Sequence, residues 1–96
     1  MAHYVVLANF TDQGIRGVKD TAKRAKGFRD AASAMGMKVK DIFWTLGTYD
    51  VIVIFEAAKD EEAAALMMKV GALGNLKSQT LRAFTESEIP AVVSKI

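Results

Sequence analysis

The sequence predicts an α+β protein whose elements follow the order βαββαβ, with a short helix at the C-terminus. Three observations support this order. Apolar residues recur at helical spacing in two long stretches, strand-forming runs flank both stretches, and Gly47 separates two of those runs. Right-handed crossovers and pairing of neighbouring strands then give a ferredoxin-like, four-stranded antiparallel sheet with both long helices on one face.

The first strand and the first helix follow from the N-terminal third of the chain. Residues 3–10 are apolar on both faces, which is typical of a central strand. Thr11 or Asp12 is the expected N-cap of a helix that ends near Gly36. Its apolar stripe contains Ile15, Val18, Ala22, Ala25, Phe28, Ala32 and Met35.

Residues 37–46 and 49–57 are expected to form a β-hairpin. Gly47 would occupy the first central position of a two-residue loop, where a positive φ is required. The resulting register pairs Leu46 with Tyr49, Trp44 with Val51 and Ile42 with Val53.

The remaining elements are a second helix, a fourth strand and the terminal helix. Acidic residues at positions 60–62 suit the positive end of a helix dipole, and Gly74 ends this helix. Residues 76–84 predict the fourth strand. A capping box at 85–88 then starts a short helix, whose apolar face consists of Ile89, Val92, Val93 and Ile96.

Alternation of side chains assigns residues to the two faces of the sheet. The apolar side of the hairpin is assigned to the helices: Ile42, Trp44, Leu46, Val51, Val53 and Phe55. The other side is assigned to an open face: Asp41, Phe43, Thr45, Asp50, Ile52, Ile54 and Glu56. We expect the first and fourth strands to add to the open face Tyr4, Val6, Ala8, Phe10, Ser78, Thr80, Arg82 and Phe84. Val5, Leu7, Leu81 and Ala83 would then lie inside.

Composition limits the class of protein. A chain of 96 residues forms one domain, 1–96, and 51% hydrophobic residues leave more apolar surface than one small core can bury, which favours a homo-oligomer. The absence of cysteine excludes disulfides, thiolate metal sites and thiol nucleophiles. The chain has neither a basic, apolar leader nor an apolar run of about 20 residues, so we expect a cytoplasmic protein that does not enter membranes.

The candidate ligand site lies on the open face. Arg82 could hold a carboxylate or an enolate there, with Asp50 as a base. An ordinary ion pair, or an aspartate that accepts backbone amides at the start of a strand, is the alternative. The full set of expected ligand-binding residues is Arg82, Asp50, Thr45, Thr80, Phe43 and Phe10.

Other chemistry receives little support. His3, the only imidazole, could exchange protons at the mouth of a cavity or be a frayed terminal residue, and neither a metal site nor a cofactor is expected. Acidic residues interrupt the basic first helix, so it is interpreted as a solvated face that binds no nucleic acid.

Taken in order along the chain, several residues resemble the GYD-domain family, small bacterial proteins that mostly have no assigned function. The matching residues are Thr11, Gln13, Gly14, Gly47, Tyr49, Asp50, Glu56, Gly74, Asn75 and the run 80–84. The resemblance implies a homodimeric α+β barrel, in which two sheets face each other around a ligand cavity.

Three functions are consistent with this resemblance and with the residues. The favoured one is a homo-oligomeric module that binds a small ligand or regulates another protein, with its cavity over the open face. The alternative is a cofactor-independent monooxygenase or isomerase acting on a small organic acid or phenol, in which Arg82 stabilises an oxyanion and Asp50 or His3 moves protons. The third is a pure oligomerisation module. Whether the protein is an enzyme is left open.

Overall fold

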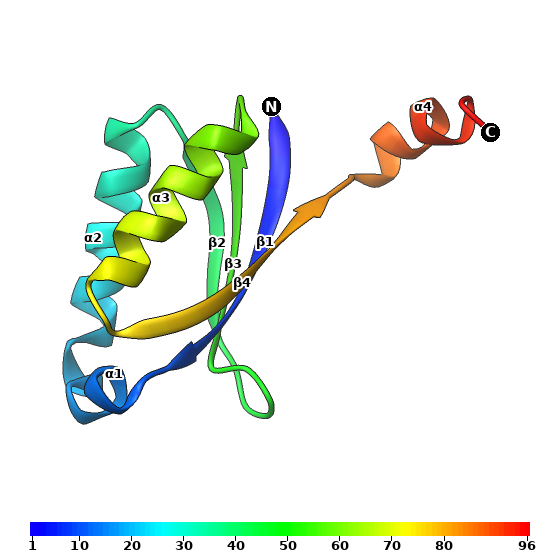
Figure 1. Cartoon of the computed structure of the whole chain (residues 1–96). Helices are drawn as coiled ribbons and strands as arrows, with labels where there is room; N and C mark the ends of the chain where they lie inside the picture. The colour runs from blue at the N-terminus through cyan, green and yellow to red at the C-terminus, as the bar shows by residue number, and fades with distance from the viewer.

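The computed structural model describes all residues, 1–96, and confirms the ferredoxin-like α+β fold (Figure 1). The sheet has the order β2-β3-β1-β4, and every neighbouring pair is antiparallel. The strands are β1 (Ala2–Phe10), β2 (Lys38–Trp44), β3 (Val51–Ala57) and β4 (Leu76–Ala83). The helices are α1 (Asp12–Arg16), η1 (Val18–Asp20), α2 (Thr21–Ala34), α3 (Asp60–Ala72), η2 (Glu86–Glu88) and α4 (Ile89–Val93).

The hydrophobic core lies between the sheet and the two long helices, α2 and α3, which cover the same face (Figure 1). Phe55 of the central strand β3 is fully buried at its centre. The ring of Tyr4 stacks on it at 5.2 Å, and the ring of Phe28 from α2 meets it edge-on at 6.4 Å. Leu66 of α3 is also fully buried.

The predicted hairpin register is correct near the strand ends but wrong at the loop. Trp44 pairs with Val51 and Ile42 with Val53, as predicted. The strands stop there, however, and the six residues 45–50 connect them in place of a two-residue turn. Gly47 has a φ of +119°, which agrees with the conformation predicted for it.

The side chains of β1 face opposite to the predicted direction. Cross-strand neighbours share a face, and β1 aligns its residues with core residues of β3: Tyr4 with Phe55, Val6 with Val53 and Ala8 with Val51. These three residues are therefore buried under the helices, while Val5 and Leu7 lie on the uncovered face. The prediction failed because both faces of β1 are apolar, so its sequence contains no alternation that indicates orientation.

The edge strand β4 is inverted in the same way, because it takes its orientation from β1. The register aligns Ser78 with Ala8, Thr80 with Val6 and Arg82 with Tyr4. Thr80 and Arg82 therefore lie on the helix side of the sheet, and Leu81 and Ala83 lie on the uncovered side. Phe84 lies beyond the end of the strand.

The uncovered face of the sheet has an apolar centre. The register of the four strands brings together Val5, Leu7, Phe43, Ile52, Ile54 and Leu81. Phe43 is half exposed, and no helix covers this face (Figure 1). His3, Asn9, Asp41, Glu56 and Gln79 surround the apolar centre at the same parity. The hairpin residues predicted for this face are correctly placed where they lie in the strands, but Thr45 and Asp50 lie in the loop.

The single first helix predicted from the sequence is divided into three segments. Gly17 ends α1, and a 3₁₀ turn then leads into α2. Arg24 of α2 reaches back to this break and donates hydrogen bonds to the carbonyl oxygens of Gly14, at 3.1 Å, and Gly17, at 2.9 Å. A Cβ atom on Gly17 would lie 2.3 Å from the Arg24 guanidinium. The glycine therefore leaves space for the arginine.

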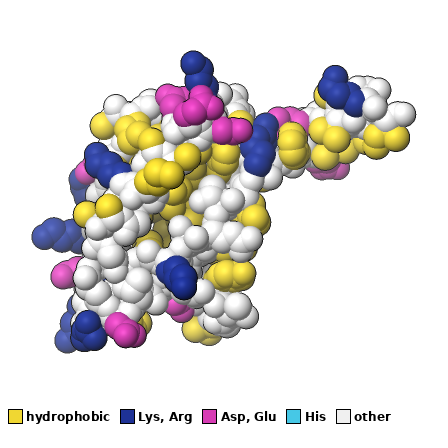
Figure 2. Space-filling view, in the orientation of Figure 1, with side chains coloured by type: hydrophobic (Ala, Val, Ile, Leu, Met, Phe, Trp, Pro, Cys, Tyr) yellow, Lys and Arg dark blue, Asp and Glu magenta, His cyan; other side chains and the backbone are white.

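The C-terminal residues form an arm that projects from the domain (Figure 1). The capping box predicted between Thr85 and Glu88 is present and starts η2. The apolar side chains that follow remain exposed, as Figure 2 shows along the arm: Ile89, Val92, Val93 and Ile96. None of the helices is long and apolar enough to cross a bilayer.

Gly14 is fixed by a close backbone contact. A Cβ atom at this position would lie 2.0 Å from the carbonyl oxygen of Asn75, in the turn between α3 and β4. We therefore expect Gly14→Ala to lower the free energy of unfolding by about 1–3 kcal/mol, as overpacking does elsewhere. Urea denaturation followed by tryptophan fluorescence measures the change.

Gly27 provides the matched control for this substitution. It lies in α2, and nothing would contact a Cβ atom there within 4 Å. Gly27→Ala should raise the free energy of unfolding by up to about 1 kcal/mol, because alanine is the better helix former. Equal effects of the two substitutions would contradict the backbone contact at Gly14.

Candidate functional site

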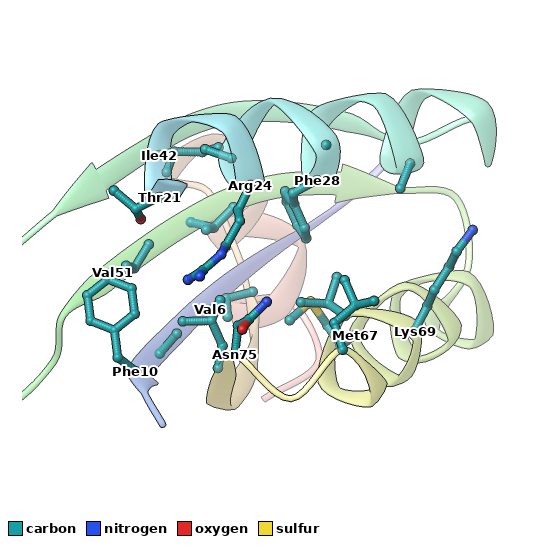
Figure 3. Close-up of a pocket in the computed structure, with 18 of the residues that line it drawn as sticks. Val6, Phe10, Thr21, Arg24, Phe28, Ile42, Val51, Met67, Lys69 and Asn75 are labelled. Carbon is teal, nitrogen blue, oxygen red and sulfur yellow. The ribbon is translucent and has the colours of Figure 1, made fainter. Parts of the chain in front are cut away.

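The main concave site is a hollow between the two long helices and the sheet, which we call the helix–sheet hollow (Figure 3). Its volume is about 350 Å³, and 14 of its 19 lining residues are hydrophobic. Val6, Val51 and Val53 form the floor. Phe28 stands on the α2 side and Met67 on the α3 side.

Short side chains explain why the core is open here. Ala8 of β1 and Ala25, Gly27 and Ala31 of α2 all line the hollow. The hollow is open to solvent, so its volume is that of a surface concavity and not of a void in the packed interior. It falls within the range of small-molecule sites, roughly 300–1,000 Å³.

Polar groups are few and lie at the edges of the hollow. Arg24 and Thr21 come from α2, Lys69 from α3 and Asn75 from the following turn. The indole Nε1 of Trp44 donates to the Thr21 hydroxyl at 2.9 Å. Trp44 is thus held at the rim although 47% of its surface is exposed.

One end of the hollow is built by hydrogen bonds between the start of α1 and the α3–β4 turn. The Thr11 hydroxyl donates to the Gly74 carbonyl at 2.6 Å and accepts from the Gly14 N–H at 3.0 Å. The Gln13 amide nitrogen donates to the carbonyl of Leu73 and to Oδ1 of Asn75, both at 2.9 Å. Two distant segments that carry the GYD resemblance therefore meet here and position Asn75.

A second, shallower pocket of about 250 Å³ lies between α3 and β4. Its polar lining comes from Tyr4, Asp60, Thr80 and Arg82. The Tyr4 hydroxyl donates to the Asp60 carboxylate. This hydrogen bond, together with burial of the ring, raises the pKa of Tyr4 above its usual value of 10.0. The Arg82 guanidinium packs over the ring of Phe84 at 4.3 Å.

The six residues predicted to bind a ligand do not form one site. Thr80 and Arg82 line the shallow pocket, and Phe10 lines the helix–sheet hollow. Phe43 lies on the uncovered face. A ligand role for each of them individually stays a prediction.

The other two predicted residues, Thr45 and Asp50, lie in the hairpin loop. The Thr45 hydroxyl donates to the Tyr49 carbonyl at 2.6 Å. The Asp50 carboxylate accepts the backbone N–H of Phe10 at 2.9 Å, which matches the structural alternative considered for this aspartate. The Asp50 N–H bonds the Ala8 carbonyl of β1, whereas Arg82 is the strand partner of Tyr4, four residues away from Ala8. At strand spacing these four residues span about 13 Å, so Asp50 and Arg82 do not form an ion pair.

His3 is a paired residue of β1 and is not a frayed terminus. Its Nε2 lies 3.2 Å from the Glu56 carboxylate, and its Nδ1 lies 3.7 Å from that of Glu88. Hydrogen bonds from the backbone N–H and the hydroxyl of Thr85 lower the pKa of Glu88. His3 therefore lies between the sheet and the base of the C-terminal arm.

Of the residues that line the helix–sheet hollow, sequence reasoning named only Phe10 as ligand-binding, and it placed Phe10 on the open face. It assigns Arg24 to a solvated basic face and Trp44 to the ordinary core. A usable signal is present in α2, where Ala25 and Ala31 occupy sheet-facing positions that larger side chains would fill. Clusters of small residues opposite a strand with valines predict reduced packing.

The raised pKa of Tyr4 generates a testable prediction. In a Tyr49→Phe protein Tyr4 is the only tyrosine, and its absorbance at 295 nm should titrate with a midpoint above pH 10.0. Above that pH the unfolded state has lost its phenol proton while the folded state keeps it. The free energy of unfolding should therefore fall as the pH rises further.

The control for the titration is Tyr4→Phe, which should lack the absorbance change with a midpoint above pH 10.0. A midpoint at or below pH 10 in the Tyr49→Phe protein would show that the hydrogen bond to Asp60 does not hold the phenol proton.

Comparison with solved structures agrees with the fold. The protein TTHA0845 from Thermus thermophilus matches with a TM-score of 0.58 at 18% identity, over 88% of this chain and 95% of that one. The hypothetical protein PHS023 from Pyrococcus horikoshii also gives 0.58, at 20% identity over 92% of this chain and 95% of that one.

Sequence comparison identifies the family. A protein of Thermus thermophilus named glutamine synthetase and cystathionine beta-lyase binding protein is 26% identical over 92 residues, which cover 95% of this chain and 97% of that protein. The model of the GYD domain matches residues 4–93, nearly the whole chain. The resemblance seen in the sequence is confirmed, and the protein belongs to the GYD-domain family.

Proposed function

We propose that this protein is a homodimeric binding module that takes up a small, largely apolar molecule in the helix–sheet hollow and so regulates a partner. The observation that carries the proposal is the volume of about 350 Å³ with a mostly apolar lining. Such a site binds by excluding water from apolar surface, and a few polar groups at its edges set the orientation of the ligand.

The lining of the hollow favours binding over turnover. Apart from the Trp44 indole, its polar side chains are those of Thr21, Arg24, Lys69 and Asn75. None of them is a carboxylate or an imidazole, the groups that usually act as general acids or bases near neutral pH. The oxygenase or isomerase alternative needs Arg82 to converge with Asp50 or His3. Asp50 lies in the hairpin loop, and His3 faces the uncovered side of the sheet, opposite to Arg82. Turnover would instead have to use Tyr4, Asp60 and Arg82 of the shallow pocket.

Filling the hollow tests ligand uptake. We expect native mass spectrometry of freshly purified protein to show a bound molecule, and Ala25→Leu to abolish that adduct, because the added side chain occupies the lined space. The control is Ala22→Leu on the exposed side of the same helix, which should keep it. Adducts that persist equally in both variants would place the ligand elsewhere.

A second copy of the chain is the proposed cover for the uncovered face. Six apolar side chains gather at its centre, with polar residues around them, which is the usual anatomy of a protein interface. The exposed apolar side of the arm would add contacts beyond the sheet.

Charge on the uncovered face should separate the two copies. In sedimentation equilibrium at micromolar concentration, we expect the protein to have twice its chain mass of 10.4 kDa. The double substitution Phe43→Lys, Leu81→Lys should halve the observed mass. The control is Met68→Lys on α3, which is also exposed but lies on the other side of the sheet. A monomeric parent protein would refute the dimer.

Binding of another protein is a second candidate function. The Thermus thermophilus relative is named for binding two enzymes. The feature of this chain that supports a similar role is the projecting arm, with exposed Ile89, Val93 and Ile96.

If the protein dimerises but its hollow never takes up a molecule, the oligomerisation module becomes the better description.

A further inference from the structure

We propose that the ligand of the helix–sheet hollow is an amphipathic anion, namely an aliphatic or aromatic carboxylic acid of small size. This inference rests on the proposed function, since it assumes that the hollow takes up a small molecule. The evidence is the sign, position and hydrogen bonding of the few polar groups around an otherwise apolar space.

The charged residues that line the hollow have one sign. They are Arg24 and Lys69, and no aspartate or glutamate is among the 19 lining residues. Neither cation takes part in an ion pair, because the salt bridges of the molecule involve other side chains. The hollow is therefore electrostatically suited to an anion and opposes a cation.

Arg24 is held in position but is not saturated. Two of its N–H groups donate to the Gly14 and Gly17 carbonyls, and a guanidinium has five such groups. Figure 3 shows the side chain reaching from α2 across the opening toward Asn75, between Phe10 and Phe28. Because main-chain carbonyls fix it, little side-chain entropy is lost when a further group binds.

Asn75 supplies a second donor at the same end. Its Oδ1 already accepts from Gln13 at 2.9 Å, which leaves its amide N–H groups free to donate. In Figure 3 this amide lies below the Arg24 guanidinium. The exposed Lys69 stands at the right of the view, away from Arg24, and contributes a solvent-screened positive charge.

These groups define the orientation of the ligand. A carboxylate matches the planar fork of a guanidinium, so the head group belongs at Arg24 and Asn75. The apolar body then extends over the valine floor toward Met67 and Val70. A charge placed deeper would be unpaired among apolar side chains, which is strongly unfavourable.

Three probes of equal chain length test the charge preference: octanoate, 1-octanol and octylamine. Trp44 is the only tryptophan and stands at the rim, so its fluorescence reports occupancy. We expect octanoate to bind at least about 10-fold more tightly than 1-octanol, with octylamine weakest, because a paired carboxylate adds charge-assisted hydrogen bonds. Calorimetry confirms the dissociation constants.

Asn75→Asp is the most informative variant. Aspartate keeps the oxygen that accepts from Gln13 but replaces the free donor with a negative charge. We expect octanoate affinity to fall at least about 10-fold while 1-octanol affinity stays within about 2-fold, since only the anion is repelled. Arg24→Met should act in the same direction, and Lys23→Met on the exposed side of α2 should change neither affinity.

The outcomes separate the two proposals. Equal affinities for octanoate and 1-octanol, or an equal loss of both in Asn75→Asp, would overturn the anion preference and leave uptake of a small molecule standing. If none of the three probes changes Trp44 fluorescence or releases heat, and freshly purified protein carries no adduct, the proposed function itself fails. If Arg24→Met is unfolded, Asn75→Asp still decides the question.

Discussion

The pairing of β1 with β3 is the constraint on which the rest of the structure depends. It aligns Tyr4 with Phe55 and Val6 with Val53, which places four large apolar side chains on the helix side of the sheet. β4 then follows β1, so this one register also decides where Thr80 and Arg82 lie. Because the period of a strand is two, a slip by one residue would exchange core and surface in β1 and β4 together.

The junction between α1 and the α3–β4 turn gives the hollow its polar end. Backbone contact at Gly14, the Thr11 hydroxyl and the Gln13 amide fix the turn from one side, and Arg24 ties α1 to α2. The residues that carry the family resemblance here are therefore positioning residues for the site as well as turn residues. Their hydrogen bonds explain why a small domain can keep an opening in its core without its helices separating from the sheet.

Much of the fold could be predicted from the sequence, but the site could not. Strand-forming runs on both sides of Gly47 predict a hairpin, although the length of its loop was wrong, and element order then gives the topology. Strand β1 is apolar on both faces, so only tertiary pairing selects which face Val6 occupies. The break at Gly17 depends on Arg24 seven residues later, and the hollow depends on the absence of large side chains at Ala25 and Ala31. Local patterns do not contain these long-range effects.

The irregularity in β2 has a consequence for how the protein avoids uncontrolled growth. β2 is an edge strand, and its ladder with β3 is shifted by one extra residue at Lys40. The bulge twists the edge, and lysines at 38 and 40 add charge along it, both of which disfavour strand addition by another chain. The β2 edge therefore disfavours edge-to-edge growth into filaments. Contacts made through the uncovered face of the sheet can then end in a closed, finite assembly.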